Sequence, residues 1–127
     1  MFFGLFKKEP VAFNSGYLPE ENGHQVFFHE FGNPQGIPVL AFHGGPGYYS
    51  SPGHTKSFDL KKQRVILFDQ RGGGKSLPAG ETKNNTTNDL LHDAKRLLTH
   101  LQIDKVVLSG SSWGSTLALL FAQQQQN

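Results

Sequence analysis

The chain has no cysteine, no long hydrophobic run and no cluster of basic residues. The absence of cysteine excludes disulfides and thiol chemistry and suits a cytoplasmic protein, so we expect a cytoplasmic location. No apolar stretch approaches the ~20 residues of a membrane span, so we expect no membrane partner. Lysine and arginine occur singly or in pairs and the formal net charge is only +2. We therefore expect no nucleic-acid partner.

The N-terminus lacks the pattern of a signal peptide. Residues 1–6 are apolar, but Lys7 and Lys8 follow this stretch instead of preceding it, and no small-residue cleavage site appears. We predict a hydrophobic N-terminal arm that packs on the body of the protein. With 127 residues, 36% of them hydrophobic, the chain has the size and composition of one modest globular domain.

Three short, continuous apolar runs are typical of strands buried in a parallel sheet. They are residues 37–42, 65–68 and 105–109. Between the second and third runs, Thr86 or Thr87 can cap a helix. The apolar face of this helix comprises Leu90, Leu91, Ala94, Leu97, Leu98 and Leu101. The order strand, helix, strand predicts an α/β fold with a mostly parallel sheet and flanking helices.

Two further strands are predicted near the N-terminus. Residues 25–31 are dense in strand-forming side chains, and turn-forming residues 33–36 follow, so we predict a hairpin-like pair with residues 37–42. Residues 11–17 are a weaker strand prediction because Asn14 and Gly16 lie within them.

The most informative motif is Gly110-Ser111-Ser112-Trp113-Gly114, between a strand-like run and a helix-forming run. This setting is typical of a nucleophile elbow, a sharp turn on which glycines two residues before and after the serine allow close backbone packing. Only Ser112 has glycine at both positions; Ser111 and Ser115 do not. Ser112 is therefore the predicted nucleophile.

No aspartate, glutamate or histidine follows Trp113 in the sequence, and all six histidines precede Ser112. In the fold that uses this turn, the acid and then the base follow the serine along the chain. A serine hydroxyl is a weak nucleophile until a positioned base removes its proton. We therefore expect that the triad acid and base are absent from this chain.

Each of the three apolar runs ends in an unusual loop: residues 43–47, residues 69–76 and the elbow. Ligand sites in α/β sheets lie at the carboxyl ends of the strands. In the fold that uses the elbow, one oxyanion-hole donor lies in the first of these loops and the other is the amide after the nucleophile. This predicts the amides of Gly45, with Gly44 as the alternative, and of Trp113.

We expect structural roles for three other residues near these loops. His43 suits an imidazole that hydrogen-bonds loop backbone, and Asp69 and Arg71 are expected to anchor their loop through a charge-assisted hydrogen bond. The remaining histidines show no metal-ligand spacing, so no metal is predicted; they are His24, His29, His54, His92 and His100.

The sequence Gly74-Lys75-Ser76 after a strand suggests a phosphate-binding loop, but the pattern fails. A P-loop needs a glycine five residues before Gly74, where the chain has Asp69. Pro78 also blocks the helix that would have to begin after the serine. Nucleotide binding is therefore not predicted.

Four motifs together resemble proline iminopeptidase, a serine peptidase of the α/β-hydrolase superfamily. They are His43-Gly44-Gly45-Pro46-Gly47, residues 69–76, Asn85-Thr86-Thr87 and residues 110–118. The likeness runs from about Ser15 to Gln123. Ser111 and Gly73 depart from the family's usual residues, both by exchange of one small residue for another.

The resemblance implies an enzyme that releases N-terminal proline from peptides through an acyl-enzyme, without metal or organic cofactor. By motif, Ser112 is the nucleophile, and the amides of Gly45 and Trp113 form the oxyanion hole. Residues 1–127 then correspond to a single partial domain, the N-terminal portion of an α/β-hydrolase fold truncated after the nucleophile helix, without the cap domain and the C-terminal strands.

Three functions remain open at this point. The implied partner is a peptide with an N-terminal proline, and the chain alone is expected to be inactive. Another α/β-hydrolase activity, such as an esterase or amidase, would use the same elbow. A noncatalytic fragment, or one that associates with a complementing C-terminal polypeptide, is the third alternative.

Overall fold

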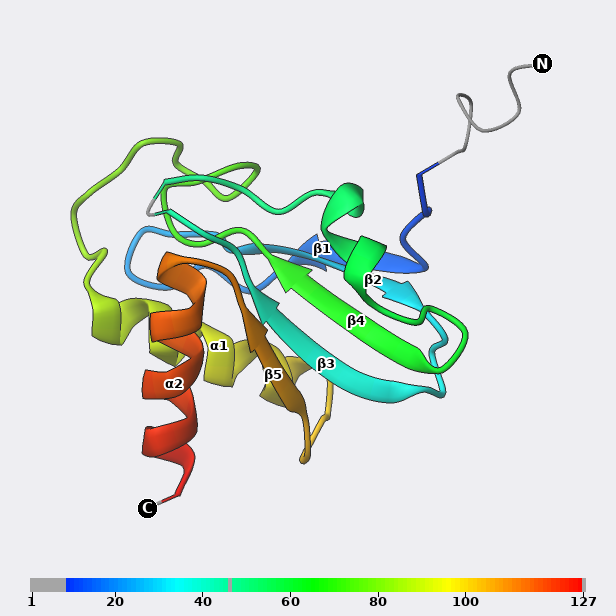
Figure 1. Ribbon diagram of the computed structural model, residues 1–127. Helices are drawn as coiled ribbons and strands as arrows, with labels where there is room; N and C mark the ends of the chain where they lie inside the picture. Colours follow the sequence, from blue (N-terminus) through cyan, green and yellow to red (C-terminus); the bar gives the residue numbers. More distant parts are fainter. Residues whose placement is uncertain (1–8, 46, 127) are drawn as a thin grey trace.

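The computed structural model describes residues 9–45 and 47–126 and shows a five-stranded sheet with two α-helices and a short 3-10 helix (Figure 1). The strands are β1 (Asn14–Tyr17), β2 (Phe27–Gly32), β3 (Ile37–Phe42), β4 (Gln63–Phe68) and β5 (Val107–Gly110). The helices are α1 (Thr87–His100), α2 (Trp113–Gln125) and the short 3-10 helix η2 (Pro52–Ser57). The predicted N-terminal arm, residues 1–6, lies outside the described residues, as does Pro46.

The strand order in the sheet is β1-β2-β4-β3-β5. β3 runs parallel to β4 and β5, whereas β2 runs antiparallel to β1 and β4. The predicted α/β class is confirmed. The sheet is mixed, with parallel pairing confined to the three strands whose carboxyl ends carry the unusual loops.

The predicted hairpin between residues 25–31 and 37–42 is wrong, because β4 lies between β2 and β3. The turn at residues 33–36 passes over the start of β4, where the amide of Ile37 donates to the carbonyl of Lys62 at 2.9 Å. The last four residues of β4 are all buried, so this apolar strand gains most from a central position between two neighbours.

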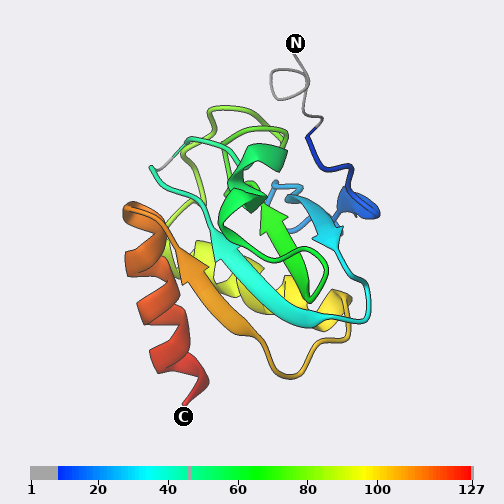
Figure 2. The ribbon, with the colours of Figure 1, turned by 45° about the vertical axis from the view of Figure 1, so that its right-hand side comes forward.

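One face of the sheet is covered by α1 and α2, which lie on the same side (Figure 2). Side chains of β3 and β4 on this face pack against buried residues of both helices. The buried set is Leu40, Phe42, Ile66, Phe68, Leu90, Leu91, Ala94, Leu97, Leu98, Leu117 and Phe121. Each large apolar side chain buried in this way contributes about 1.5–3 kcal/mol, so this face holds the main core.

The start of α1 settles which threonine caps it. The hydroxyl of Thr86 accepts a hydrogen bond from the amide of Asp89 at 3.2 Å, and the Asp89 carboxylate accepts from the Thr86 amide at 2.9 Å. These reciprocal bonds satisfy two amides that the first turn of a helix leaves unpaired. They also hold the Asp89 carboxylate in its charged form, so its pKa is lowered.

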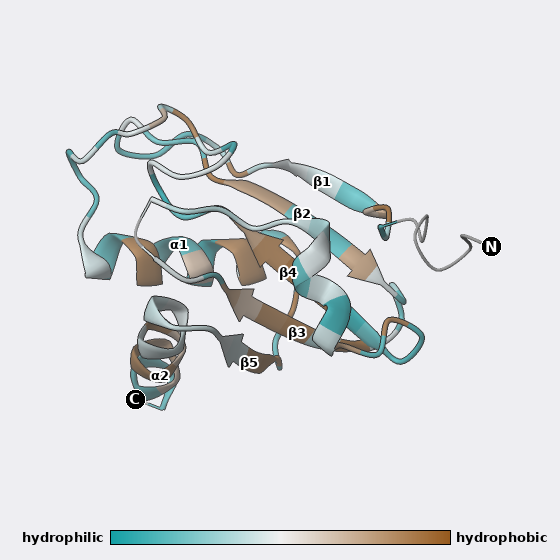
Figure 3. Ribbon diagram, turned by 45° about the horizontal axis from the view of Figure 1, so that its top comes forward, coloured by the Kyte–Doolittle hydropathy of each residue, from teal (hydrophilic) through white to brown (hydrophobic). Residues whose placement is uncertain are grey.

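The other face of the sheet carries η2 and a smaller apolar cluster (Figure 3). Its buried members are Phe31, Val65 and Leu67, and the partly buried side chains packed on them include Ala41, Phe58 and Leu60. Within residues 9–45 and 47–126, neither helix combines the length and the apolar character that a membrane crossing needs.

Candidate active site

Ser112 lies on the turn between the last residue of β5 and the first residue of α2. Its backbone angles are φ 54° and ψ −122°, a conformation that residues other than glycine rarely adopt and that costs on the order of 1–3 kcal/mol. The residue is exposed. The sharp strand-to-helix turn predicted from the sequence is present, and it displays a strained serine at the N-terminal end of α2.

The two glycines of the motif are required by close backbone contacts. A Cβ atom added to Gly114 would lie 2.0 Å from the carbonyl oxygen of Phe42, and one added to Gly110 would lie 2.3 Å from the carbonyl oxygen of Gly114. Both obstacles are backbone atoms, which no side-chain rotation can remove. The elbow therefore packs directly against the end of β3, and this contact fixes the position of Ser112.

The loop after β3, residues 43–47, is called the glycine loop below. It faces Ser112 across a shallow hollow, which is lined by Gly44, Gly45, Gly47, Tyr48 and Ser112. A Cβ atom added to Gly44 would lie 3.3 Å from the Cβ of Ser112. Gly45 has φ +61°, in the left-handed region that glycine tolerates best. The structure thus brings the predicted nucleophile and the loop of one predicted donor together.

The second predicted donor lies at the start of α2. Trp113 is the first residue of this helix, so its amide has no partner within the helix. The N-terminal end of a helix also carries a partial positive charge, which stabilises a nearby anion. An oxyanion formed on a group attached to Ser112 would lie beside this end of α2.

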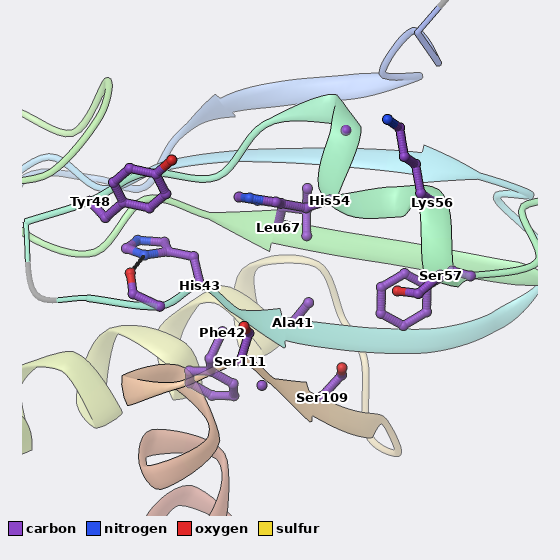
Figure 4. Close-up of a pocket in the computed structure, with 14 residues that line it drawn as sticks. Ala41, Phe42, His43, Tyr48, His54, Lys56, Ser57, Leu67, Ser109 and Ser111 are labelled. Atoms are coloured by element: carbon purple, nitrogen blue, oxygen red, sulfur yellow. Dashed lines mark hydrogen bonds between the residues drawn. The ribbon is translucent and has the colours of Figure 1, made fainter.

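His43 is buried behind the glycine loop and is held in one neutral tautomer. Its Nε2 accepts a hydrogen bond from the main-chain amide of Gln70 at 3.0 Å, so the ring proton must be on Nδ1. Nδ1 then donates to the carbonyl of Gly44 at 2.9 Å (Figure 4). Burial lowers the pKa of His43, which favours the same neutral form. Both ring nitrogens are engaged with loop backbone.

The Asp69 side chain links its own loop to Ser50, which lies just after the glycine loop. One carboxylate oxygen accepts from the amide and the hydroxyl of Ser50, at 2.6 and 2.7 Å, and the other accepts from the amide of Lys75 at 2.9 Å. The Ser50 hydroxyl in turn accepts from Nε2 of His29 at 2.9 Å. Burial lowers the pKa of His29 to about 4, so this ring is neutral near pH 7.

Arg71 anchors the same loop to α1. Its guanidinium makes two hydrogen bonds to the Asp93 carboxylate, at 2.6 and 2.9 Å, and a third to the carbonyl of Asn84 at 2.6 Å. Arg71 and Asp93 are both only 1% exposed. Asp69 and Arg71 therefore have different partners, and among the described hydrogen bonds none joins them to each other.

Gln70 contributes to this arrangement, and the sequence did not point to it. Its side chain donates to the carbonyl of His43 at 3.0 Å and accepts from the indole N–H of Trp113 at 3.2 Å. The only signal in the sequence is its place between Asp69 and Arg71 in a loop after a strand. Its partners become visible only once the order of β4, β3 and β5 is known.

None of the described hydrogen bonds of the histidines reaches Ser112. His24 bonds the Lys83 carbonyl, His29 bonds Ser50, His43 bonds Gln70 and Gly44, His54 accepts from the Ser51 amide, and His92 pairs with Glu21. The absence of the triad base from this chain stays a prediction. Among the described residues no cluster of three or more histidine, aspartate or glutamate side chains is arranged to hold a metal.

A second cavity lies on the η2 face of the sheet beside the hollow (Figure 4). It is lined by Ser111, not Ser112, together with His43, Tyr48, His54 and other residues of β3, β5 and η2. We place the candidate site in the hollow, because Ser112 and the glycines of the loop after β3 line it together.

Comparisons with known proteins agree with this fold. Residues 37–127 match the family model described as the alpha/beta hydrolase fold. The chain is 48% identical over 113 residues to a protein of Leptolyngbya boryana named "Probable proline iminopeptidase", covering 89% of this chain and 35% of that protein. It is 44% identical to the proline iminopeptidase of Xanthomonas citri, over 90% of this chain and 36% of that one.

Solved structures show the same likeness. The crystal structure of a proline iminopeptidase-related protein of Thermus thermophilus superimposes with a TM-score of 0.77 at 26% identity. The match covers 87% of this chain and 40% of that one. The chain therefore spans a little over a third of the length of the curated relatives above.

Proposed function

The chain belongs to the alpha/beta hydrolase fold family and is a homologue of proline iminopeptidases, and from that premise we propose that it supplies the nucleophile and oxyanion hole of a serine peptidase. The proposed substrate is a peptide with an N-terminal proline. The observation that carries this proposal is Ser112: exposed, strained, at the start of α2 and facing a glycine loop.

In the proposed reaction, Oγ of Ser112 attacks the carbonyl carbon of the N-terminal proline while a base takes the hydroxyl proton. The amides of Gly45, or alternatively Gly44, and of Trp113 stabilise the oxyanion that forms. The carbon–nitrogen bond then breaks, the leaving amine takes up the proton, and water hydrolyses the prolyl ester on Ser112. Each oxyanion donor is worth on the order of 10²–10³ in rate. The chemistry needs no metal or organic cofactor.

The acid and base of this reaction are proposed to lie outside residues 1–127. The sequence has no aspartate, glutamate or histidine after Trp113, and none of the described hydrogen bonds of the histidines reaches Ser112. Loss of the triad base alone costs about 10⁶ in turnover. We therefore expect residues 1–127 alone to be effectively inactive.

A complementing C-terminal polypeptide is the proposed partner, and the sheet offers a place for it. β5 pairs with β3 on one side, and no strand in the described part of the chain pairs with its other edge. Val107 on β5 is 52% exposed and Leu119 on α2 is 69% exposed. An unpaired, partly apolar edge strand is prone to pair with another chain.

The test compares two proteins with L-proline 4-nitroanilide as substrate. One is the 127-residue chain alone; the other is the same chain extended by the part of the Leptolyngbya boryana relative that lies beyond the matched residues. We expect turnover only from the extended protein, and Ser112→Ala should abolish it. Turnover by the 127-residue chain that depends on Ser112 would contradict the missing base. Undiminished turnover by the extended Ser112→Ala variant would contradict the nucleophile.

The alternatives are separated by the same assay with other substrates. An esterase would hydrolyse 4-nitrophenyl acetate far faster than the proline anilide. A noncatalytic fragment would remain inactive when extended, while size-exclusion chromatography of the 127-residue chain would show association or aggregation. The matched controls are Ser111→Ala and Ser115→Ala, which remove neighbouring hydroxyls outside the glycine frame and should retain turnover.

A further inference from the structure

Gln70 is buried between the two segments that carry the predicted oxyanion donors. It is 1% exposed and lies two residues after the end of β4. Its main-chain amide donates to the ring of His43, its side-chain amide donates to the carbonyl of His43, and its side-chain oxygen accepts from the indole of Trp113. One residue therefore contacts both the start of the glycine loop and the start of α2.

The bond from the Gln70 amide orients the glycine loop through His43. Because Nε2 of His43 accepts this bond, Nδ1 carries the proton and donates to the carbonyl of Gly44. In a trans peptide the carbonyl and the following amide point in opposite directions. Because the Gly44 carbonyl is held toward His43, the Gly45 amide must point away from His43. Gly45 itself lines the hollow with Ser112.

The side chain of Gln70 positions the other donor. Its oxygen holds the indole N–H of Trp113, the same residue whose main-chain amide is the second predicted donor. Its nitrogen holds the main chain of His43 at 3.0 Å. A single planar carboxamide thus links the two donor segments, and a change in its position would alter the distance between them.

We propose that Gln70 is a positioning residue that sets the distance and direction between the two oxyanion donors. This inference rests on the proposed function, because it assigns the donors to Gly45 and Trp113. A glutamine is suited to this place, since its amide offers a donor and an acceptor on one rigid plane. Glutamate would lack the donor. Methionine would lack both the donor and the acceptor while filling a similar volume.

The experiment uses the extended protein that turns over L-proline 4-nitroanilide, with Gln70→Met as the main variant. A 1 Å misplacement of a catalytic group can cost about 10²-fold in rate. We expect kcat to fall by about 10- to 100-fold while KM stays within about twofold. The inhibition constant of L-proline boronic acid, a tetrahedral mimic, should rise by a similar factor, whereas inhibition by proline itself should hardly change.

Trp113→Phe is the second variant, because it removes the indole donor and keeps the main-chain amide. We expect a smaller loss of kcat, of about 3- to 10-fold, again with weaker boronate binding. In the double variant the losses should not multiply, since both substitutions break one link. If Gln70→Met fails to fold, Trp113→Phe tests the proposal instead. An unchanged kcat and an unchanged inhibition constant of L-proline boronic acid would then overturn it.

Thr55→Val is the matched control for a lost buried hydrogen bond. The Thr55 hydroxyl donates to the carbonyl of Pro52 within η2, away from both donors and from the peptide that Gln70 shares with Asp69, and Thr55 is 1% exposed. It should lower the melting temperature without changing kcat. The same behaviour in Gln70→Met, a lower melting temperature with kcat retained, would make Gln70 merely structural and overturn the proposal. Failure of the proposed function is seen separately, as turnover that survives Ser112→Ala.

Discussion

The loop after β4 and the elbow before α2 lie side by side but are built in opposite ways. Asp69, Gln70 and Arg71 are each at most 2% exposed, and their side chains are bonded to several other segments. Ser112 is exposed, has a positive φ, and no described hydrogen bond joins its hydroxyl to another group. The buried loop holds the segments around the elbow in fixed positions.

This difference shows how the chain keeps a strained residue at its surface. A backbone conformation that costs about 1–3 kcal/mol persists only where the surroundings determine it. Here the constraints are the glycine contacts with β3 and the bonds of Gln70 to the neighbouring loops. The bonds of the buried loop therefore stabilise the structure enough to keep Ser112 in its strained, exposed conformation.

The largest expected effect comes from breaking the buried loop at Arg71. Arg71→Ala removes two of the three hydrogen bonds to the buried carboxylate of Asp93, which then keeps only the 3.2 Å bond from Arg96, and removal of one member of a buried ion pair costs about 3–5 kcal/mol. We expect the free energy of unfolding, measured with urea, to fall by this amount. Arg71→Lys keeps the charge and should lose less. A loss below about 1 kcal/mol for Arg71→Ala would show that the loop is not anchored by this pair.

The second largest effect is expected where the elbow presses on β3. Gly114→Ala would place a methyl group 2.0 Å from a backbone carbonyl, and such overpacking costs about 3 kcal/mol at the upper end of its usual range. The matched control is Gly53→Ala, whose added atom would meet nothing closer than 3.7 Å. It should be nearly neutral in the same urea titration. Equal stability of the two variants would contradict the close contact.

The third effect is a pH dependence of the unfolding free energy that arises from His29, whose ring bonds the Ser50 hydroxyl after the glycine loop. Because the pKa of His29 is lowered to about 4 in the folded chain, the unfolded chain binds this proton first as pH falls below ~6.5. Stability contributed by the neutral ring is therefore lost between about pH 6.5 and 4, amounting to about 2 kcal/mol between pH 7 and 4.5. His29→Gln should flatten this part of the stability profile.

The control for this prediction is His100→Gln, which changes an exposed histidine on α1. Unfolding free energies of the three proteins at pH 7, 5.5 and 4.5 are compared. Only His29→Gln should show a smaller decrease toward acid. An unchanged slope in that variant would mean that His29 is free to protonate in the folded chain.

The smallest effect is a gain of stability at the elbow itself. Ser112→Gly relieves the positive φ, but glycine loses more conformational freedom on folding, so the net gain is up to about 1 kcal/mol. Ser111→Gly has no such strain to relieve and should lose about 0.5–1 kcal/mol. Melting temperatures that shift in opposite directions would confirm the strain, and a loss of stability in Ser112→Gly would argue against it.

Features with a local pattern were predicted well from the sequence. The run at residues 37–42 is β3 to the residue, and the helix is capped by Thr86, one of the two threonines that the sequence offered as caps. The turn at Ser112 is present because the glycine spacing itself encodes the close packing. In each case the residues that determine the structure are neighbours along the chain.

Features that depend on strand order were not predicted. The hairpin was wrong because the turn at residues 33–36 gives no sign that β4 inserts between its two strands. The contacts of Gln70 and the chain of bonds from Asp69 through Ser50 to His29 join segments from separate parts of the sequence. Such contacts are set by packing of distant elements, for which a single sequence carries no periodic signal.

The most direct test of the account is to locate the acyl group during turnover. The extended protein is mixed with L-proline 4-nitrophenyl ester, quenched with acid, digested and analysed by mass spectrometry. The account predicts a prolyl ester on Ser112. A prolyl group on Ser111 or Ser115, or turnover with no acylated serine in this segment, would contradict it.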